Sequence, residues 1–145
     1  MSSTPPEAAR LLLGPVLALV ALSYATALSI LVTRLQDALA GRGLRFYEVY
    51  VGGGSPAVER TTRQLANLFE FPVLFFAAAG FAIACGMNDG LFRWLAWSYA
   101  GLRCAHAIIH LTPMLNRLWL RTPVFMVSNF VLLGIWGRLA RWLSA

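Results

Sequence analysis

An uncharged run at residues 11–32 is the feature that most limits what this chain can fold into. A helix rises about 1.5 Å per residue, so this run reaches roughly 33 Å, enough to cross the roughly 30 Å hydrocarbon core of a bilayer. A signal peptide is the alternative, but its apolar region would be too long, and Arg10 is the only basic residue ahead of it. We therefore predict a membrane-spanning helix.

The composition extends this prediction to the whole chain. Of the 145 residues, 59% are hydrophobic and 12% charged, and the mean hydropathy is +0.66, whereas soluble domains carry about 25% charged residues. All 12 basic residues are arginine, and the net charge is +6. These arginines lie beside apolar runs and form no separate basic stripe, so membrane lipid with anionic head groups is the expected partner and nucleic acid is not.

Turn and capping signals divide the chain into four helices. Ser55 and Pro56 are a good N-cap and first helical residue, Asn88-Asp89-Gly90 is a turn, and Thr122-Pro123 is a second helix start. We predict an all-α membrane protein, a four-transmembrane-helix up-and-down bundle, as a single domain over residues 1–145. The predicted helices cover about 8–35, 56–87, 91–111 and 122–143.

Arginine counts predict the orientation. Seven arginines lie at the two connections on one side and four lie on the other. The positive-inside rule then places both termini outside the cytoplasm. The two groups are Arg34, Arg42, Arg45, Arg60, Arg63, Arg117 and Arg121, against Arg10, Arg93, Arg138 and Arg141. Arg138 and Arg141 are expected to reach lipid head groups.

Polar side chains form a stripe on the second predicted helix. Arg63, Asn67 and Glu70 stand at i, i+4 and i+7, and an apolar run continues from there to Cys85. Glu70 is thus about two turns inside the predicted span. An ionisable group at that depth is costly and is usually functional.

The third predicted helix has a matching stripe at Arg103, His106 and His110. The two helices are antiparallel neighbours, so their spacings place Asn67 level with His106 and Arg63 level with His110. Glu70 then meets Arg103, and we predict an ion pair between these two side chains.

Two interpretations of this polar set remain open. The residues could be structural contacts between helices, or they could form a site in which surplus cationic donors bind an anion or a thiolate. His106 and His110 have a metal-ligand spacing, but no third ligand is evident, so no metal is expected. The two cysteines, Cys85 and Cys104, lie in apolar segments, and we predict that both are buried and unpaired.

These motifs resemble those of a known family, MAPEG, the membrane-associated proteins in eicosanoid and glutathione metabolism. Glu59, Arg60, Arg63, Asn67 and Glu70 follow the family's E-R-x-x-R-x-x-x-N-x-x-E pattern. The segments NLFEFPVLFF (67–76) and LRCAHAIIHLT (102–112) are similar to a bacterial branch of it, and this resemblance implies a bacterial inner membrane. The resemblance covers about residues 59–136.

The resemblance implies a homotrimer that binds glutathione between neighbouring subunits near the cytoplasmic face. It implies that Arg121 stabilises the glutathione thiolate, with Thr122 beside it as a hydroxyl donor. The remaining residues expected to hold glutathione are Arg34, Arg63, Asn67, Glu70, His106 and His110. Three positions depart from other members: His110 and Phe125 stand where some have tyrosine, and Ala66 where some have a basic residue.

The function implied is a glutathione-dependent transferase or peroxidase acting on a lipophilic electrophile. No protein nucleophile is needed, which suits a chain without a Ser-His-Asp arrangement. A non-catalytic membrane binding or scaffold protein of the same fold is the first alternative. A small transporter subunit that uses the intramembrane charges is the second.

Overall fold

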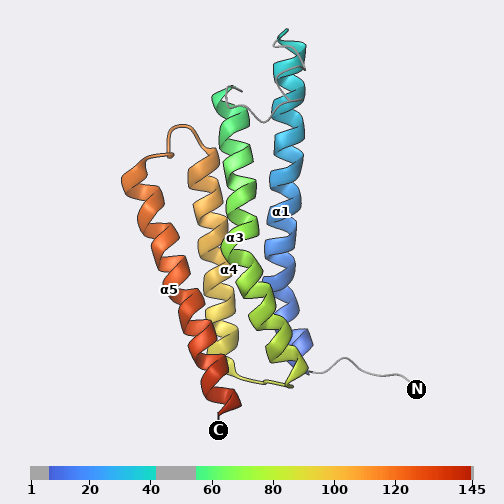
Figure 1. The fold of residues 1–145 in the computed structure, drawn as a ribbon, viewed down its shortest axis with the longest axis vertical. Coiled ribbons are helices and arrows are strands. Elements are labelled where there is room, and N and C mark those ends of the chain that lie inside the picture. Colours follow the sequence, from blue (N-terminus) through green and yellow to red (C-terminus); the bar gives the residue numbers. More distant parts are fainter. Residues whose placement is uncertain (1–6, 42–54, 145) are drawn as a thin grey trace, which may run out of the picture.

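The computed structural model describes residues 7–41 and 55–144, which form four helices with no strand among them. The helices are α1 (Glu7–Leu39), α3 (Pro56–Ala84), α4 (Gly90–Leu111) and α5 (Leu118–Leu143). They run up and down side by side, and the α4–α5 connection lies at the end opposite the chain's C-terminus (Figure 1). The predicted all-α, four-helix architecture is confirmed. The connection after residue 41, with Arg42 and Arg45, lies outside the described residues.

The start of α3 is at the predicted residue and is tied to α1. Ser55 caps the helix by accepting from the backbone N–H of Val58 at 3.4 Å, and Pro56 follows as the first helical residue. The backbone N–H of Ser55 donates to Oδ2 of Asp37 at 3.1 Å. Asp37 is buried near the end of α1, so this bond sets the height at which α3 enters the bundle.

The C-terminal ends of α1 and α3 differ from the predictions, and a glycine with positive φ lies just beyond each of them. α3 stops at Ala84, three residues earlier than expected, because Gly86 adopts φ +63°. The N–H of Met87 then reaches back to the carbonyl of Ala82 at 2.8 Å, the bond of a Schellman motif. α1 continues to Leu39, beyond the predicted 35, and Gly41 with φ +75° follows it.

The predicted start of the last helix at Thr122 is wrong. α5 begins at Leu118, and the backbone N–H of Arg121 already donates to the carbonyl of Arg117 at 2.9 Å. Pro123 therefore lies inside the helix. Proline near a helix start removes only one intrahelical hydrogen bond, so the signal at Thr122 did not prevent the preceding turn from becoming helical.

α4 is a central element of the bundle. It packs against α1, α3 and α5, whereas α1 and α5 do not contact each other. By length and composition, α1, α3 and α5 are apolar enough to cross a membrane. α4 is less apolar because it contains buried Arg103, His106 and His110, and its three neighbours cover them. The apolar core includes Leu19, Phe75, Ala96 and Ile135, while many large apolar side chains face outward.

An ion pair joins α4 and α5 at the end of the bundle opposite the α4–α5 connection. Asp89 caps α4 by accepting from the N–H of Phe92 at 3.0 Å, and Nε of Arg138 donates to its Oδ2 at 2.7 Å. Burial raises the pKa of the Asp89 carboxyl, but these hydrogen bonds and the guanidinium charge outweigh it and hold the pKa below its usual 3.8. Arg138, expected to reach lipid head groups, is therefore paired within the chain, while Arg141 is exposed.

The burial prediction for the cysteines is wrong for Cys85. It forms the C-cap of α3 and is exposed, whereas Cys104 is half-buried within α4. Both are unpaired, as predicted. Cys85 is exposed because the early end of α3 removes it from the packed helix.

Candidate functional site

A hollow of about 380 Å³ lies between α3, α4 and α5, toward the α4–α5 connection. This is at the small end of the roughly 300–1,000 Å³ of ligand pockets. Seven of the eight residues predicted to bind or activate glutathione line it. The lining is Arg63, Ala66, Asn67, Glu70, His106, His110, Arg121, Thr122 and Phe125.

α3 contributes the outward side of the hollow. Arg63, Ala66 and Glu70 lie on its exposed face, and Asn67 is half-buried. The guanidinium of Arg63 is 3.8 Å from the carboxylate of Glu59, one turn earlier, and the Arg63 side chain is 74% exposed. Exposed pairs of this kind contribute little stability, so Arg63 is available to another anion.

α4 contributes the inner wall. His106 and His110 are 2% and 3% exposed, and their rings stack with centroids 5.9 Å apart and planes 15° from parallel. Phe125 of α5 packs beneath, with its ring 5.6 Å from that of His106 and 5.5 Å from that of Phe71. The wall therefore consists of two stacked imidazole rings, one of which contacts the aromatic ring of Phe125. Some members of the family that the sequence resembles have tyrosine at the position of Phe125.

The predicted ion pair between Glu70 and Arg103 is not formed. Nη2 of Arg103 donates instead to the backbone carbonyl of Asn67 at 2.6 Å, and the side chain of Glu70 is exposed. The spacing of the two stripes predicted the depth of these residues to within a turn. It did not predict the direction in which each side chain points: Glu70 faces the hollow, and Arg103 is fully buried against α3 and α5.

Arg103 is also separated from the hollow. Its guanidinium carbon lies 5.6 Å from the centroid of the Phe125 ring, a cation–π distance. Arg103 does not line the hollow, and Phe125 does. Phe125 therefore forms the boundary between the hollow and the deeper polar interior.

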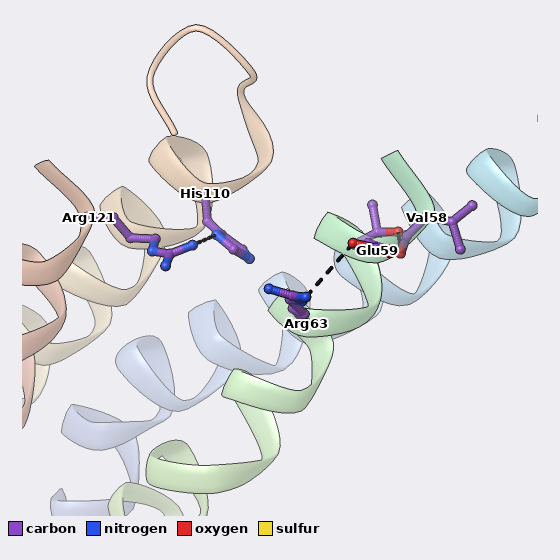
Figure 2. A network of polar contacts seen from close by, with 6 residues as sticks. Val58, Glu59, Arg63, His110 and Arg121 are labelled. Carbon is purple, nitrogen blue, oxygen red and sulfur yellow. Dashed lines mark hydrogen bonds and ion pairs between the residues drawn. The ribbon is translucent and has the colours of Figure 1, made fainter. Parts of the chain in front are cut away.

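Arg121 is brought to the site by two acceptors near the end of α4. Its Nη1 lies 3.0 Å from Nδ1 of His110 and 3.4 Å from Oδ1 of Asn116. Figure 2 shows Arg121 joined to His110, whose ring is directed toward the gap that it shares with Arg63. Asn116 was not predicted. A polar residue in the short connection before Arg121 was the available signal, but only the fold shows that it turns back to the guanidinium.

Arg34 is the predicted site residue that does not line the hollow. It lies on α1 and is half-buried, and α1 does not contact α5, which holds Arg121. Within one chain, Arg34 therefore takes no part in the lining.

The charged side chains that line the hollow favour an anionic ligand. Two guanidinium groups, of Arg63 and Arg121, face one lining carboxylate, that of Glu70. Guanidinium groups pair readily with carboxylates and stabilise thiolates. Among the described residues there is no group of three or more side chains that could hold a metal ion.

Comparison with known proteins gave one family. The model of the MAPEG family matches residues 12–141, nearly the whole chain. Neither the curated proteins nor the solved structures yielded a match.

Proposed function

The chain belongs to the MAPEG family, and from this premise we propose that it is an integral membrane, glutathione-dependent transferase or peroxidase acting on a lipophilic electrophile. One observation supports the proposal above all others. The hollow gathers Arg63, Asn67, Glu70, His106, His110, Arg121 and Thr122 from three helices. Glutathione has two carboxylates, one ammonium group and a thiol, and within one chain Arg63 offers a counter-charge to one carboxylate, Glu70 to the ammonium group and Arg121 to the thiolate.

Arg121 is the residue proposed to favour the thiolate. A guanidinium near a thiol lowers the pKa of the thiol by stabilising its anion. Nη1 of Arg121 is directed to His110 and Asn116, which leaves Nε and Nη2 as donors for a bound ligand. Thr122 lines the hollow beside it and provides a hydroxyl. Glutathione supplies the nucleophilic sulfur, which forms a bond to an electrophilic carbon as the leaving group departs with its electron pair.

We propose that the active unit is a homotrimer in which a neighbouring subunit closes the hollow. Arg63 and Glu70 are exposed in the single chain although α3 is long and apolar enough to cross a membrane. A charged side chain facing lipid is costly, so a second copy of the chain is the favourable cover. Arg34 of that copy is the residue proposed to complete the site.

The proposed setting is a bacterial inner membrane with both termini outside the cytoplasm. Arg60, Arg63, Arg117 and Arg121 lie at the end of the bundle that carries the hollow, and arginine-rich ends face the cytoplasm. The hollow then opens near the cytoplasmic face, where a soluble thiol is available, and the lipophilic substrate enters from the bilayer.

Purified protein tests the proposal by conjugation of glutathione to a chromogenic electrophile. Arg121→Ala is expected to lower the rate by about 100-fold, because removing one oriented donor to a developing anion typically costs that much or more. Arg141→Ala removes an exposed arginine at the opposite end and should leave the rate unchanged. An Arg121→Ala rate equal to that of the native protein refutes the role of Arg121.

Glutathione should also raise the melting temperature of the native protein, since a ligand that binds only the folded form stabilises it. Binding without conjugation would favour the non-catalytic alternative. If the protein neither binds nor conjugates glutathione, the proposed function as a whole is refuted.

A further inference from the structure

The contact between Arg121 and His110 determines which nitrogen of His110 carries a proton. Nη1 of Arg121 lies 3.0 Å from Nδ1 of His110. A guanidinium has donors and no acceptor. Nδ1 must therefore accept with its lone pair, and the proton of the neutral ring must be on Nε2.

A protonated His110 does not fit this position. Its Nδ1–H would face the donor of Arg121. The carboxylate of Glu59 is paired with Arg63, and Glu70 is the one carboxylate in the described lining. The lone pair on Nδ1 that the Arg121 contact requires is therefore present only in a neutral His110 ring.

The ring of His110 is also held in place. It is 3% exposed and stacks on His106. A fixed ring fixes the direction of its lone pair, and therefore the position of the guanidinium that donates to it. The second acceptor, Oδ1 of Asn116, is farther away at 3.4 Å, so His110 is the principal anchor.

We propose that His110 is a positioning residue that, as its Nε2–H tautomer, holds the guanidinium of Arg121 at the edge of the hollow. In this role it sets how strongly Arg121 stabilises an anion bound there. The effect on a glutathione thiolate rests on the function proposed above. The tautomer and the anchoring of Arg121 do not depend on that function.

The tautomer is tested by NMR of the purified protein with ¹⁵N-labelled histidine. The chain has two histidines, so a His106→Gln variant assigns the signals. The expected result is a bare Nδ1 and a protonated Nε2 on His110, with the Nδ1 signal shifted in Arg121→Ala, which removes the donor. The opposite tautomer, or an Nδ1 signal that does not respond to Arg121→Ala, overturns the proposal.

Two substitutions then separate the two ring nitrogens. In His110→Asn the amide oxygen takes the place of Nδ1, and in His110→Gln the amide takes the place of Nε2. We expect the Gln variant to lose about tenfold more conjugation rate at neutral pH than the Asn variant. Its pH–rate profile should move upward by about one unit, the equivalent of that tenfold loss. Equal losses, or a larger loss in the Asn variant, overturn the positioning role.

These measurements distinguish failure of the inference from failure of the proposed function. If the native protein neither binds nor conjugates glutathione, the proposed function fails, and the NMR result on His110 still decides the anchoring. If conjugation occurs with the opposite tautomer, the function stands and the positioning role is refuted. Melting temperature and size-exclusion profiles establish that each variant is folded.

Discussion

Arg103 shows how the environment of one residue differs from the expectation for its type. Its side chain is 0% exposed and donates once, to the carbonyl of Asn67, while its Nε and Nη1 have no partner in the described part of the chain. Burying a charge without full compensation costs several kcal/mol. The carbonyl of Asn67 lies within α3 and can keep its helical hydrogen bond without Arg103.

Replacing this arginine by an apolar side chain of similar length should therefore be tolerated. We expect Arg103→Met to leave the melting temperature unchanged or raise it, because it removes the buried charge and keeps the volume. Arg103→Ala is the control and should lower it, because it leaves a cavity. A fall of more than about 4 °C in the Met variant, roughly 1 kcal/mol for a chain of this size, would show that the assembled protein compensates the guanidinium.

Asp89 predicts a pH dependence of stability. Its pKa is lowered in the folded protein, so its contribution is present above the unfolded value, about 3.9, and is lost as the pH falls through the folded value. Asp89→Asn keeps the N-cap and removes the charge. The native protein should be more stable than this variant by about 1 kcal/mol at pH 7, and the difference should shrink as the pH falls below about 4. Thermal melts across that range provide the measurement, and a pH-independent difference would contradict the assignment.

At the scale of elements, α4 brings the site together because it has three packed faces. It presents His106 and His110 to the hollow, Arg103 to α3, and Trp97 to α1. A helix covered on three sides can carry polar groups that a lipid-facing helix cannot. The close approach of α1 to α4 depends on Gly14, since a Cβ there would lie 2.5 Å from Cζ2 of Trp97.

The close contact between Gly14 and Trp97 predicts that the effects of substituting them on stability are coupled. Gly14→Leu should lower stability by about 1–3 kcal/mol through overpacking, and adding Trp97→Ala should recover part of that loss. Gly137→Leu on α5 is the matched control, because a Cβ there meets nothing within 4 Å. Thermal melts of the native protein, of the single variants Gly14→Leu and Trp97→Ala, and of the double variant give the coupling. Equal losses at Gly14 and Gly137 would show that α1 and α4 do not depend on this contact.

The whole molecule has two chemically different ends. One end holds the hollow with Arg63, His110 and Arg121, and the other holds the start of α1, the end of α5 and the pair of Asp89 and Arg138. Figure 1 shows the α3–α4 connection at the end where the C-terminus lies. The function proposed above requires the hollow to face the cytoplasm, so the opposite end must face outward.

Cys85 makes this orientation measurable. It is exposed at the end of the bundle opposite the hollow, and Cys104, half-buried, is the other cysteine. A membrane-impermeant maleimide should label a Cys104→Ala variant on intact cells. The control, Leu115→Cys without the native cysteines, places the thiol at the opposite end and should be labelled only in inverted vesicles. The reverse pattern would refute the orientation and place the hollow outside the cytoplasm.

Local patterns were sufficient to predict the four helices and five of the residues that line the hollow. Hydrophobic runs of membrane length, the cap at Ser55, and stripes at i, i+4 and i+7 are short-range properties, and they predicted the helices and most of the residues that line the hollow. They failed at Thr122, where a cap signal was overridden by the turn before it, and at Cys85, which Gly86 leaves outside the helix.

The partners of the polar side chains could not be predicted from the sequence and are known from the tertiary structure. Residue spacing specifies depth along a helix, but the partner of a side chain depends on the rotation of each helix and on backbone groups of its neighbours. Arg103 therefore bonds to the carbonyl of Asn67 and not to Glu70, and Arg121 is anchored by His110 and Asn116. The sequence alone was enough to predict a membrane bundle with polar side chains inside it, and the packing of α4 among three helices placed some of those side chains at the hollow and buried others.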